Sequence, residues 1–90
     1  MGIAAVKMKI MPSSPEVNTK KIGERVKGLV EVSGGKNCTI SEEPIAFGLK
    51  AVIAFFAWAE EKELEELEEK LGKIEDVNSV EVIDMRRAFG

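Results

Sequence analysis

Few residues in this sequence carry side chains that could perform covalent chemistry. The chain has no histidine and a single cysteine, Cys38. This composition excludes a histidine-activated nucleophile and removes the most common metal ligand. One cysteine cannot form an internal disulfide or a CxxC pair, and it is typical of a reducing, intracellular compartment. The sequence therefore favours a protein that acts by binding, without a cofactor, over an enzyme.

Carboxylates are abundant, but their spacing does not indicate a metal site. They gather in residues 60–66, which read EEKELEE. Calcium and magnesium need several oxygen ligands that converge from different elements, whereas carboxylates along the surface of one helix diverge. We therefore interpret this run as the solvated face of a helix.

Two features exceed what folding requires. Phe47 lies beside Gly48 and shortly after Pro44, at the expected entry to a strand. A ring in this place either packs at the edge of the core or fills a pocket on a partner, as protruding aromatic side chains commonly do. Arg86 and Arg87 follow the last expected strand. Their guanidinium groups are either solvated or contact carboxylates or phosphates of a partner.

The chain that must position these residues is short and acidic. It has 90 residues, of which 44% are hydrophobic and 32% charged, and its net charge is −3. This length predicts one domain, residues 1–90, with one core. The acidic balance argues against a dedicated nucleic-acid binder. No secretory leader is visible, and the longest apolar stretch, residues 44–59, is interrupted by Gly48 and Lys50, so we expect a soluble cytoplasmic protein without membrane contact.

Strands are predicted from alternation and from composition. Apolar residues alternate with lysines in residues 3–11, and apolar with hydroxyl side chains in residues 36–43. Both patterns are typical of strands with one solvated face. Residues 45–59 are rich in Val, Ile, Phe and Trp, which favours a long central strand. Residues 77–85 form the last predicted strand, and residues 86–90 a tail.

Helical spacing predicts two helices. The first begins at a cap formed by Asn18 or Thr19 and ends before residues 33–35, which read SGG. The second spans residues 60–73, with Gly72 as its C-terminal cap. The apolar stripes consist of Ile22, Val26, Leu29 and Val30 in the first helix and of Leu64, Leu67 and Leu71 in the second.

The resulting order predicts an α+β, ferredoxin-like βαββαβ sandwich, in which a four-stranded antiparallel sheet carries both helices on one face. The other face is then open. The outward residues of the long central strand are Ala51, Ile53, Phe55 and Ala57. Because an open face is usually polar, this apolar row predicts either a homo-oligomer that buries it or a strand end that curls back onto the tail.

The motifs and their order resemble the guanine-nucleotide exchange domain of the elongation factor 1-beta family. Residues 43–50 (EPIAFGLK) are similar to its PIxFGxK signature. Residues 6–12 (VKMKIMP) resemble its first strand with the proline that follows, and residues 77–87 resemble its last strand. The resemblance covers the whole chain. It fits the archaeal branch, because the eukaryotic factors carry an additional N-terminal domain.

This resemblance implies an exchange factor that promotes GDP release from elongation factor 1-alpha, the GTPase that delivers aminoacyl-tRNA. In the family the signature phenylalanine wedges into the GTPase, and Phe47 occupies that position, with Ile45 and Lys50 beside it in the motif. A cation near the C-terminus disturbs the magnesium site beside the nucleotide. The eukaryotic family has lysine there, whereas this sequence has Arg87, next to Arg86 and three residues from its end.

Two other functions fit the same topology. An RNA-binding module needs solvent-facing aromatic residues on both central strands, and Phe55 is the only outward candidate here. A small-ligand-binding regulatory module also remains open. A metal chaperone would carry a CxxC loop after the first strand, where residues 12–15 read PSSP. An RNA shift assay and calorimetry against metabolites would separate these functions from nucleotide exchange.

Overall fold

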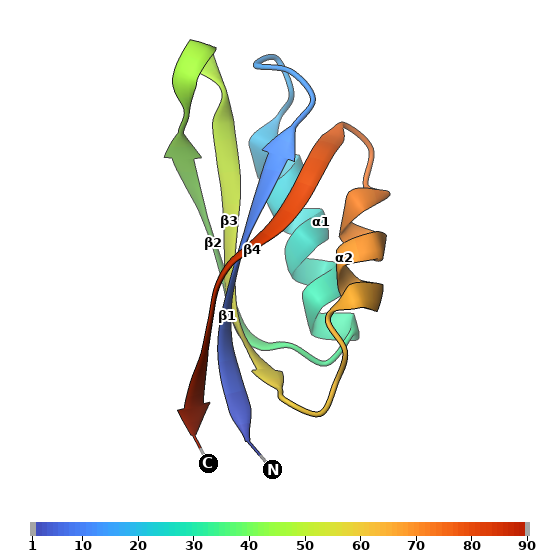
Figure 1. The fold of residues 1–90 in the computed structure, drawn as a ribbon. Helices are drawn as coiled ribbons and strands as arrows, with labels where there is room; N and C mark the ends of the chain where they lie inside the picture. The colour runs from blue at the N-terminus through green and yellow to red at the C-terminus, as the bar shows by residue number, and fades with distance from the viewer. Residues whose placement is uncertain (1, 90) are drawn as a thin grey trace.

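The structure is a computed structural model of the chain, and it describes residues 2–89. It contains four strands and two α-helices in the order βαββαβ (Figure 1). The elements are β1 (Ile3–Pro12), α1 (Thr19–Val32), β2 (Lys36–Pro44), a 3-10 turn η1 (Ala46–Gly48), β3 (Lys50–Ala59), α2 (Glu65–Gly72) and β4 (Val77–Phe89). The predicted α+β, ferredoxin-like architecture is confirmed.

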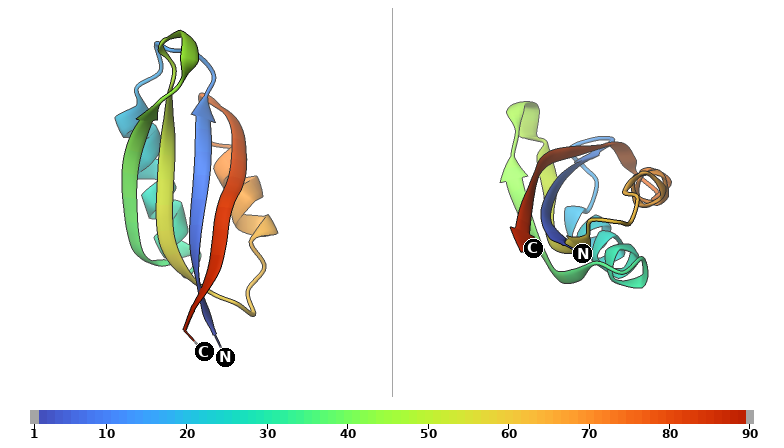
Figure 2. Two further views of the ribbon diagram at one scale, coloured as in Figure 1. Left: turned by 60° about the vertical axis from the view of Figure 1, so that its left-hand side comes forward. Right: turned by 60° about the horizontal axis from the view of Figure 1, so that its bottom comes forward.

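The strands form one antiparallel sheet in the order β2-β3-β1-β4, and both helices cover the same face of it (Figures 1 and 2). Strand β1 pairs with β3 on one side and with β4 on the other, so that Val6 lies opposite both Phe56 and Met85. The sheet curls around the helices, and the molecule is elongated, with extents of 41 × 21 × 18 Å. This shape separates the loop between β2 and β3 from the end of the molecule where the two termini lie (Figure 1).

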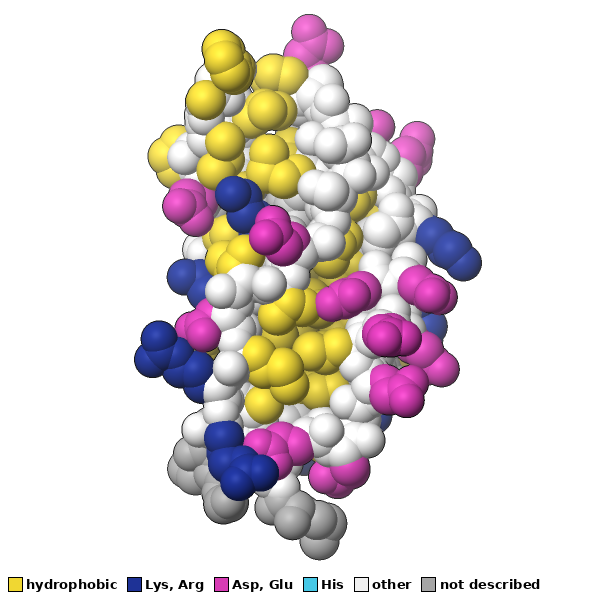
Figure 3. Space-filling model, in the orientation of Figure 1, with side chains coloured by type: hydrophobic (Ala, Val, Ile, Leu, Met, Phe, Trp, Pro, Cys, Tyr) yellow, Lys and Arg dark blue, Asp and Glu magenta, His cyan; other side chains and the backbone are white. Residues whose placement is uncertain are grey.

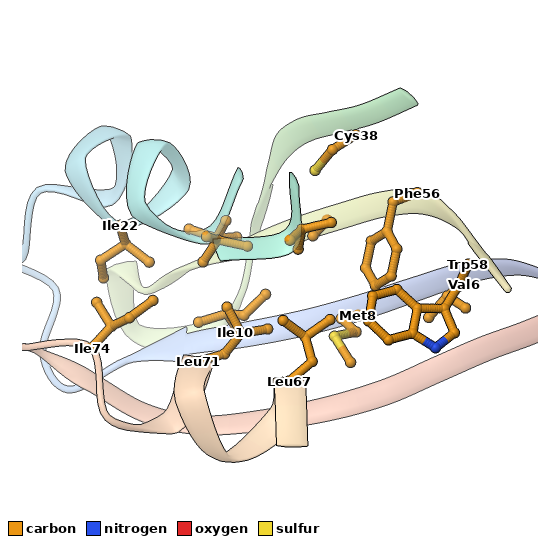
Figure 4. Packing of buried hydrophobic residues seen from close by; sticks show 14 of the residues in the cluster. Val6, Met8, Ile10, Ile22, Cys38, Phe56, Trp58, Leu67, Leu71 and Ile74 are labelled. Atoms are coloured by element: carbon orange, nitrogen blue, oxygen red, sulfur yellow. The ribbon is translucent and has the colours of Figure 1, made fainter. Parts of the chain in front are cut away.

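The core lies between the sheet and the two helices (Figure 4). Every second residue of β1 and β3 points into the core. The apolar stripes of α1 and α2 pack against these residues from the helical side, as the periodicities predicted. Its largest fully buried side chains are those of Phe56, Met8, Ile10, Leu67, Leu71, Val6, Val26, Val30 and Val52. The close approach of α1 to β2 requires Gly23, because a Cβ there would lie 2.8 Å from Cγ2 of Ile40.

Helix α1 begins where the sequence predicted. The side-chain oxygen of Asn18 accepts hydrogen bonds from the backbone N–H groups of Lys20 and Lys21, at 3.0 and 3.4 Å. These bonds satisfy two of the amide groups that a helix leaves unpaired at its start. Of the two residues proposed as the cap, the structure therefore selects Asn18 over Thr19.

Helix α2 is shorter than predicted, because it begins at Glu65 rather than at residue 60. Residues 60–64 form a turn that tertiary contacts hold in place. The indole N–H of Trp58 donates to the carbonyl of Lys62 at 3.1 Å. The ammonium group of Lys62 donates to the carbonyl of Ser33 and lies 5.0 Å from the centre of the Trp58 ring. These contacts outweigh the helix propensity of the acidic run. The helix ends at Gly72, one residue before the predicted bound, and its cap is Lys73 rather than Gly72.

The prediction of a tail after residue 85 is wrong. Strand β4 continues to Phe89, and its backbone pairs with β1 as far as Ile3. Irregular register along this pair bends β4, which is a common feature of edge strands. Arg86 and Arg87 therefore project from a paired strand.

The outward row of β3 is less exposed than predicted. Ala51 and Ile53 are buried, Ala57 is half-buried, and Phe55 is the exposed residue of the row, with 45% of its surface accessible. Strand β3 has a partner strand on each side, so that Ile53 lies opposite both Lys9 of β1 and Ser41 of β2. Phe55 remains exposed on this face, and the homo-oligomer suggested by the apolar row stays a prediction.

Candidate functional site

Residues 45–49 form a tight loop between β2 and β3, and we call this loop the tip. Its ends are joined by a hydrogen bond of 2.7 Å from the N–H of Ile45 to the carbonyl of Leu49. The N–H of Leu49 also donates to the carbonyl of Ala46 at 3.3 Å. The predicted strand from residue 45 is therefore wrong over its first five residues. Composition favoured a strand there, but two residues with positive φ reverse the chain direction.

Phe47 lies at the extreme of the tip, with 94% of its surface exposed. Its backbone has φ 64° and ψ 29°, in the left-handed region, and Gly48 follows with φ 77°. This conformation costs about 1–2 kcal/mol for a residue with a Cβ. An exposed ring gains no burial energy that could offset this cost. Strained residues of this kind concentrate at functional sites, where the backbone aims a side chain for a task other than folding.

The base of the tip is apolar and its flank is positively charged. Ile45 and Leu49 are half-buried under the loop, and Lys50 is exposed at the start of β3. The loop after β1 lies alongside, since a Cβ on Gly48 would be 4.0 Å from Cβ of Pro15. A groove of about 250 Å³ separates this loop from the hairpin. Figure 3 shows hydrophobic side chains gathered at this end of the molecule. The structure thus brings together three predicted contact residues: Phe47, Ile45 and Lys50.

The two arginines lie at the other end, near the termini of the chain (Figure 1). Arg87 donates two hydrogen bonds to the carboxylate of Glu60, from Nε to Oε1 at 2.7 Å and from Nη2 to Oε2 at 3.1 Å. The hydrogen bond from Arg87 lowers the pKa of Glu60 and raises that of the guanidinium. Arg86 pairs with Asp84 at 3.2 Å. Both arginines are exposed, and each is held by a carboxylate of this chain.

Sequence reasoning did not identify Glu60 as a partner of Arg87. It placed Glu60 on a solvated helix face, whereas the residue belongs to the turn that follows β3. The pairing depends on β4 extending past residue 85, so no local pattern could have indicated it. The arginine end and the tip are also far apart on a molecule 41 Å long. The structure does not bring the two predicted sets of contacts into one site.

Other chemistry is sparse in the part of the chain that the structure describes. No group of three or more His, Cys, Asp or Glu side chains there could hold a metal ion. Cys38 is buried, and its burial, together with the nearby charge of Glu31, raises the pKa of its thiol. Within the same residues, no helix is long and apolar enough to cross a membrane. The exposed tip is the feature that most needs a functional explanation.

Comparison with known proteins gives a consistent result. Residues 5–88 match the EF-1 guanine nucleotide exchange domain. A protein of Methanosarcina barkeri named elongation factor 1-beta is 39% identical over 97% of this chain and 99% of its own length. Proteins of the same name from Methanococcus aeolicus (44%, covering 94% and 97%) and Methanocaldococcus jannaschii (37%, covering 98% and 100%) are similar along their whole lengths. The resemblance noted in the sequence is confirmed.

Proposed function

This chain belongs to the EF-1 guanine nucleotide exchange domain family, and we propose that it promotes the release of GDP from elongation factor 1-alpha in the cytoplasm. The family and the names of the archaeal relatives support a role as a nucleotide exchange factor in translation elongation. We further propose that elongation factor 1-alpha is the GTPase and that the tip and Arg87 of this chain act on it. It treats residues 1–90 as one exchange domain.

The observation that carries the proposal is the state of Phe47. Its ring is almost fully exposed in a strained backbone, so it contributes nothing to the core. A rigid hairpin presents the ring, because the tip is closed by backbone hydrogen bonds and continues into two paired strands. An aromatic side chain held in this way can enter a pocket of a partner with little loss of conformational entropy.

The residues around the ring suit the same role. Ile45 and Leu49 extend the apolar surface at the base of the tip, and Lys50 adds a positive charge on its flank. We assign the ring to the centre of the contact and Lys50 to its rim. In such an arrangement the central side chain supplies most of the binding energy, while the charge at the rim mainly affects the association rate.

The arginine end offers the second predicted contact. GDP in a GTPase is held largely by magnesium and by a lysine and backbone amides around the phosphates. A guanidinium group that approaches this region competes with the cations that hold the phosphates. Arg87 must leave Glu60 to do so, which makes Glu60 a competitor for the arginine. Since the tip and Arg87 lie at opposite ends, a GTPase that meets both must contact the full length of this chain.

Nucleotide release by this route needs no acid, base or nucleophile on the exchange factor. The factor must only bind the nucleotide-free GTPase more tightly than the GDP-bound form. That difference in affinity is what displaces the nucleotide equilibrium, because a ligand with equal affinity for two states shifts nothing.

Stopped-flow release of fluorescent GDP from elongation factor 1-alpha tests the proposal. The release rate should rise with the concentration of this chain and then saturate, as expected when a complex with the GDP-bound GTPase precedes release. Heat-denatured chain at the same concentrations is the control. A rate equal to spontaneous release at every concentration would contradict the proposed function.

A further inference from the structure

A second groove is lined by residues of both helices. The two helices form the layer that covers one face of the sheet (Figures 1 and 2). We call this groove the helical groove. Its volume is about 470 Å³. One wall is a stripe along α1 formed by Arg25, Gly28, Leu29 and Val32, and the other is the end of α2 with Lys70, Lys73 and Ile74.

The floor of the helical groove is apolar and partly unprotected. Leu29 is half-buried and Ile74 is nearly buried, whereas Val32 has 85% of its surface exposed. Leu29 packs against the core, whereas Val32, about one turn later on α1, lies largely outside it. Val32 therefore adds apolar surface that the core of this chain does not use.

Gly28 distinguishes this groove from ordinary helix packing. A glycine inside a helix is unfavourable relative to alanine, and a close approach of another segment is one reason for its presence. Gly23 of the same helix fits that rule, because a Cβ there would collide with Ile40. A Cβ at Gly28 would meet nothing within 4 Å. Among the residues that the structure describes, no packing contact therefore requires a glycine at position 28, whereas a side chain that enters the groove from outside would.

The rim of the helical groove is uniformly basic. Arg25, Lys70 and Lys73 surround it, and no carboxylate is among the residues that line it. None of the three forms an ion pair with another side chain that the structure describes. The positive charges of Lys70 and Lys73 also stabilise the C-terminal end of α2, because they interact favourably with the helix dipole. The helix dipole does not account for Arg25, which lies in the middle of α1. A basic cluster is also unexpected in a chain that has more acidic than basic residues.

We propose that the helical groove binds an acidic, amphipathic segment of a second protein. A large apolar side chain of that segment rests over Gly28 and against Val32, and its carboxylates meet the three cations at the rim. The groove lies on the helical layer, whereas the tip lies at the end of the β2-β3 hairpin. The inference is independent of the exchange function.

The test uses the full chain and a fluorescein-labelled synthetic helix that has leucine on one face and glutamate on the other. We expect saturable anisotropy, and amide shifts in NMR spectra at Gly28 and Ile74. Gly28→Leu should weaken binding by about tenfold or more, because leucine fills the space that the incoming side chain needs. The melting temperature of this variant should not fall, since leucine is a better helix former than glycine.

Charge-reversal variants test whether the basic rim contributes to binding of the peptide. Lys70→Glu combined with Lys73→Glu should weaken binding as strongly as Gly28→Leu, while Lys27→Glu, on another face of α1, should not. The Gly28→Leu variant should still accelerate GDP release, which separates this inference from the proposed function. Equal binding of a lysine-for-glutamate peptide, or no effect of Gly28→Leu, would overturn the proposal. The proposal would also be overturned if the chain formed a dimer that Gly28→Leu dissociates. Binding of RNA or of anionic vesicles through the same cations, in place of the peptide, would overturn it as well.

Discussion

The two ends of this molecule present exposed side chains in opposite ways. At the tip, Phe47 has a strained backbone, and its ring is 94% exposed rather than packed against the described residues. At the arginine end, Arg87 is exposed as well, but two hydrogen bonds from its guanidinium group fix it to Glu60. The ring is therefore ready to bind a partner, whereas the guanidinium must first exchange one carboxylate for another anion.

This difference separates two kinds of contact. A preorganised apolar ring contributes binding energy directly, because little order must be created when it is buried. A paired cation contributes only the difference between its new partner and its old one. We therefore expect the tip to dominate nucleotide exchange and the arginine end to adjust it.

The largest effect should come from Phe47→Ala. Loss of a central aromatic contact typically costs about 2–4 kcal/mol of binding, so GDP release should slow by about 30-fold or more. The melting temperature should stay nearly unchanged, because the ring is exposed. Stopped-flow kinetics and thermal unfolding measure the two quantities.

Two other phenylalanines serve as controls. Phe56 is fully buried, and its replacement by alanine should lower the free energy of unfolding by about 3–5 kcal/mol. Phe55 is partly exposed on the open sheet face, and Phe55→Ala should leave exchange intact. A large loss of stability in Phe47→Ala would instead make this ring part of the core.

A smaller effect is expected from Arg87→Ala, which should slow exchange by roughly tenfold, the scale of one charge-assisted contact to phosphate. Glu60→Gln should act in the opposite direction and accelerate exchange by a few-fold, because it releases the guanidinium. Arg86→Ala, which breaks only the pair with Asp84, is the matched comparison. Unchanged exchange in all three variants would exclude the arginine end from the mechanism.

Phe47→Gly probes the strain at the tip. Glycine adopts a positive φ without steric conflict, but it also increases the entropy of the unfolded chain. The net result should be a free energy of unfolding about 0.5–1 kcal/mol higher than that of Phe47→Ala, measured by urea denaturation. A lower value than that of Phe47→Ala would show that the left-handed backbone at this position is not strained.

The smallest effect concerns pH. The pKa of Glu60 is lowered from 4.5 by the hydrogen bond from Arg87, so the stability contributed by this pair is fully present above the ordinary glutamate pKa. It is lost as the pH falls through the lowered pKa of the folded state. Between neutrality and about pH 5, the wild type and Glu60→Gln should therefore keep a constant difference in melting temperature. That difference should shrink only in more acidic solution.

Regular periodicity allowed most of the fold to be predicted from the sequence. The alternation in β1 and the stripe of α1 fixed those elements, and the strands β1 and β2 end within one residue of the prediction. The order of the elements then predicted the topology. These features depend on local patterns that the core enforces, because each apolar face must be buried.

The errors arise at a local turn that composition concealed and at two places where tertiary contacts override local preference. An apolar composition favoured a strand at the tip, but Gly48 and the strained Phe47 reverse the chain there. The loop could have been predicted from Pro44 and Gly48, because these two residues interrupt regular secondary structure on either side of a short segment. The extension of β4 and the late start of α2 depend on pairing with β1 and on the contacts of Trp58, which no local window contains.

The candidate site was predicted in part. The resemblance identified Phe47, Ile45 and Lys50, and the structure places these residues together at one end of the chain. Their functional roles remain predictions. The separation of the two ends and the pairing of Arg87 with Glu60 are properties of the assembled sheet, so they could not be obtained from residue spacing.

The most direct test of the account compares the affinity of this chain for elongation factor 1-alpha in two states. Titration calorimetry with the nucleotide-free GTPase should give a dissociation constant at least about 100-fold lower than titration with the GDP-bound form, since exchange depends on that difference. Phe47→Ala should reduce the affinity for the nucleotide-free form. Equal dissociation constants for the two states would contradict the account, because a protein that does not distinguish them cannot promote release.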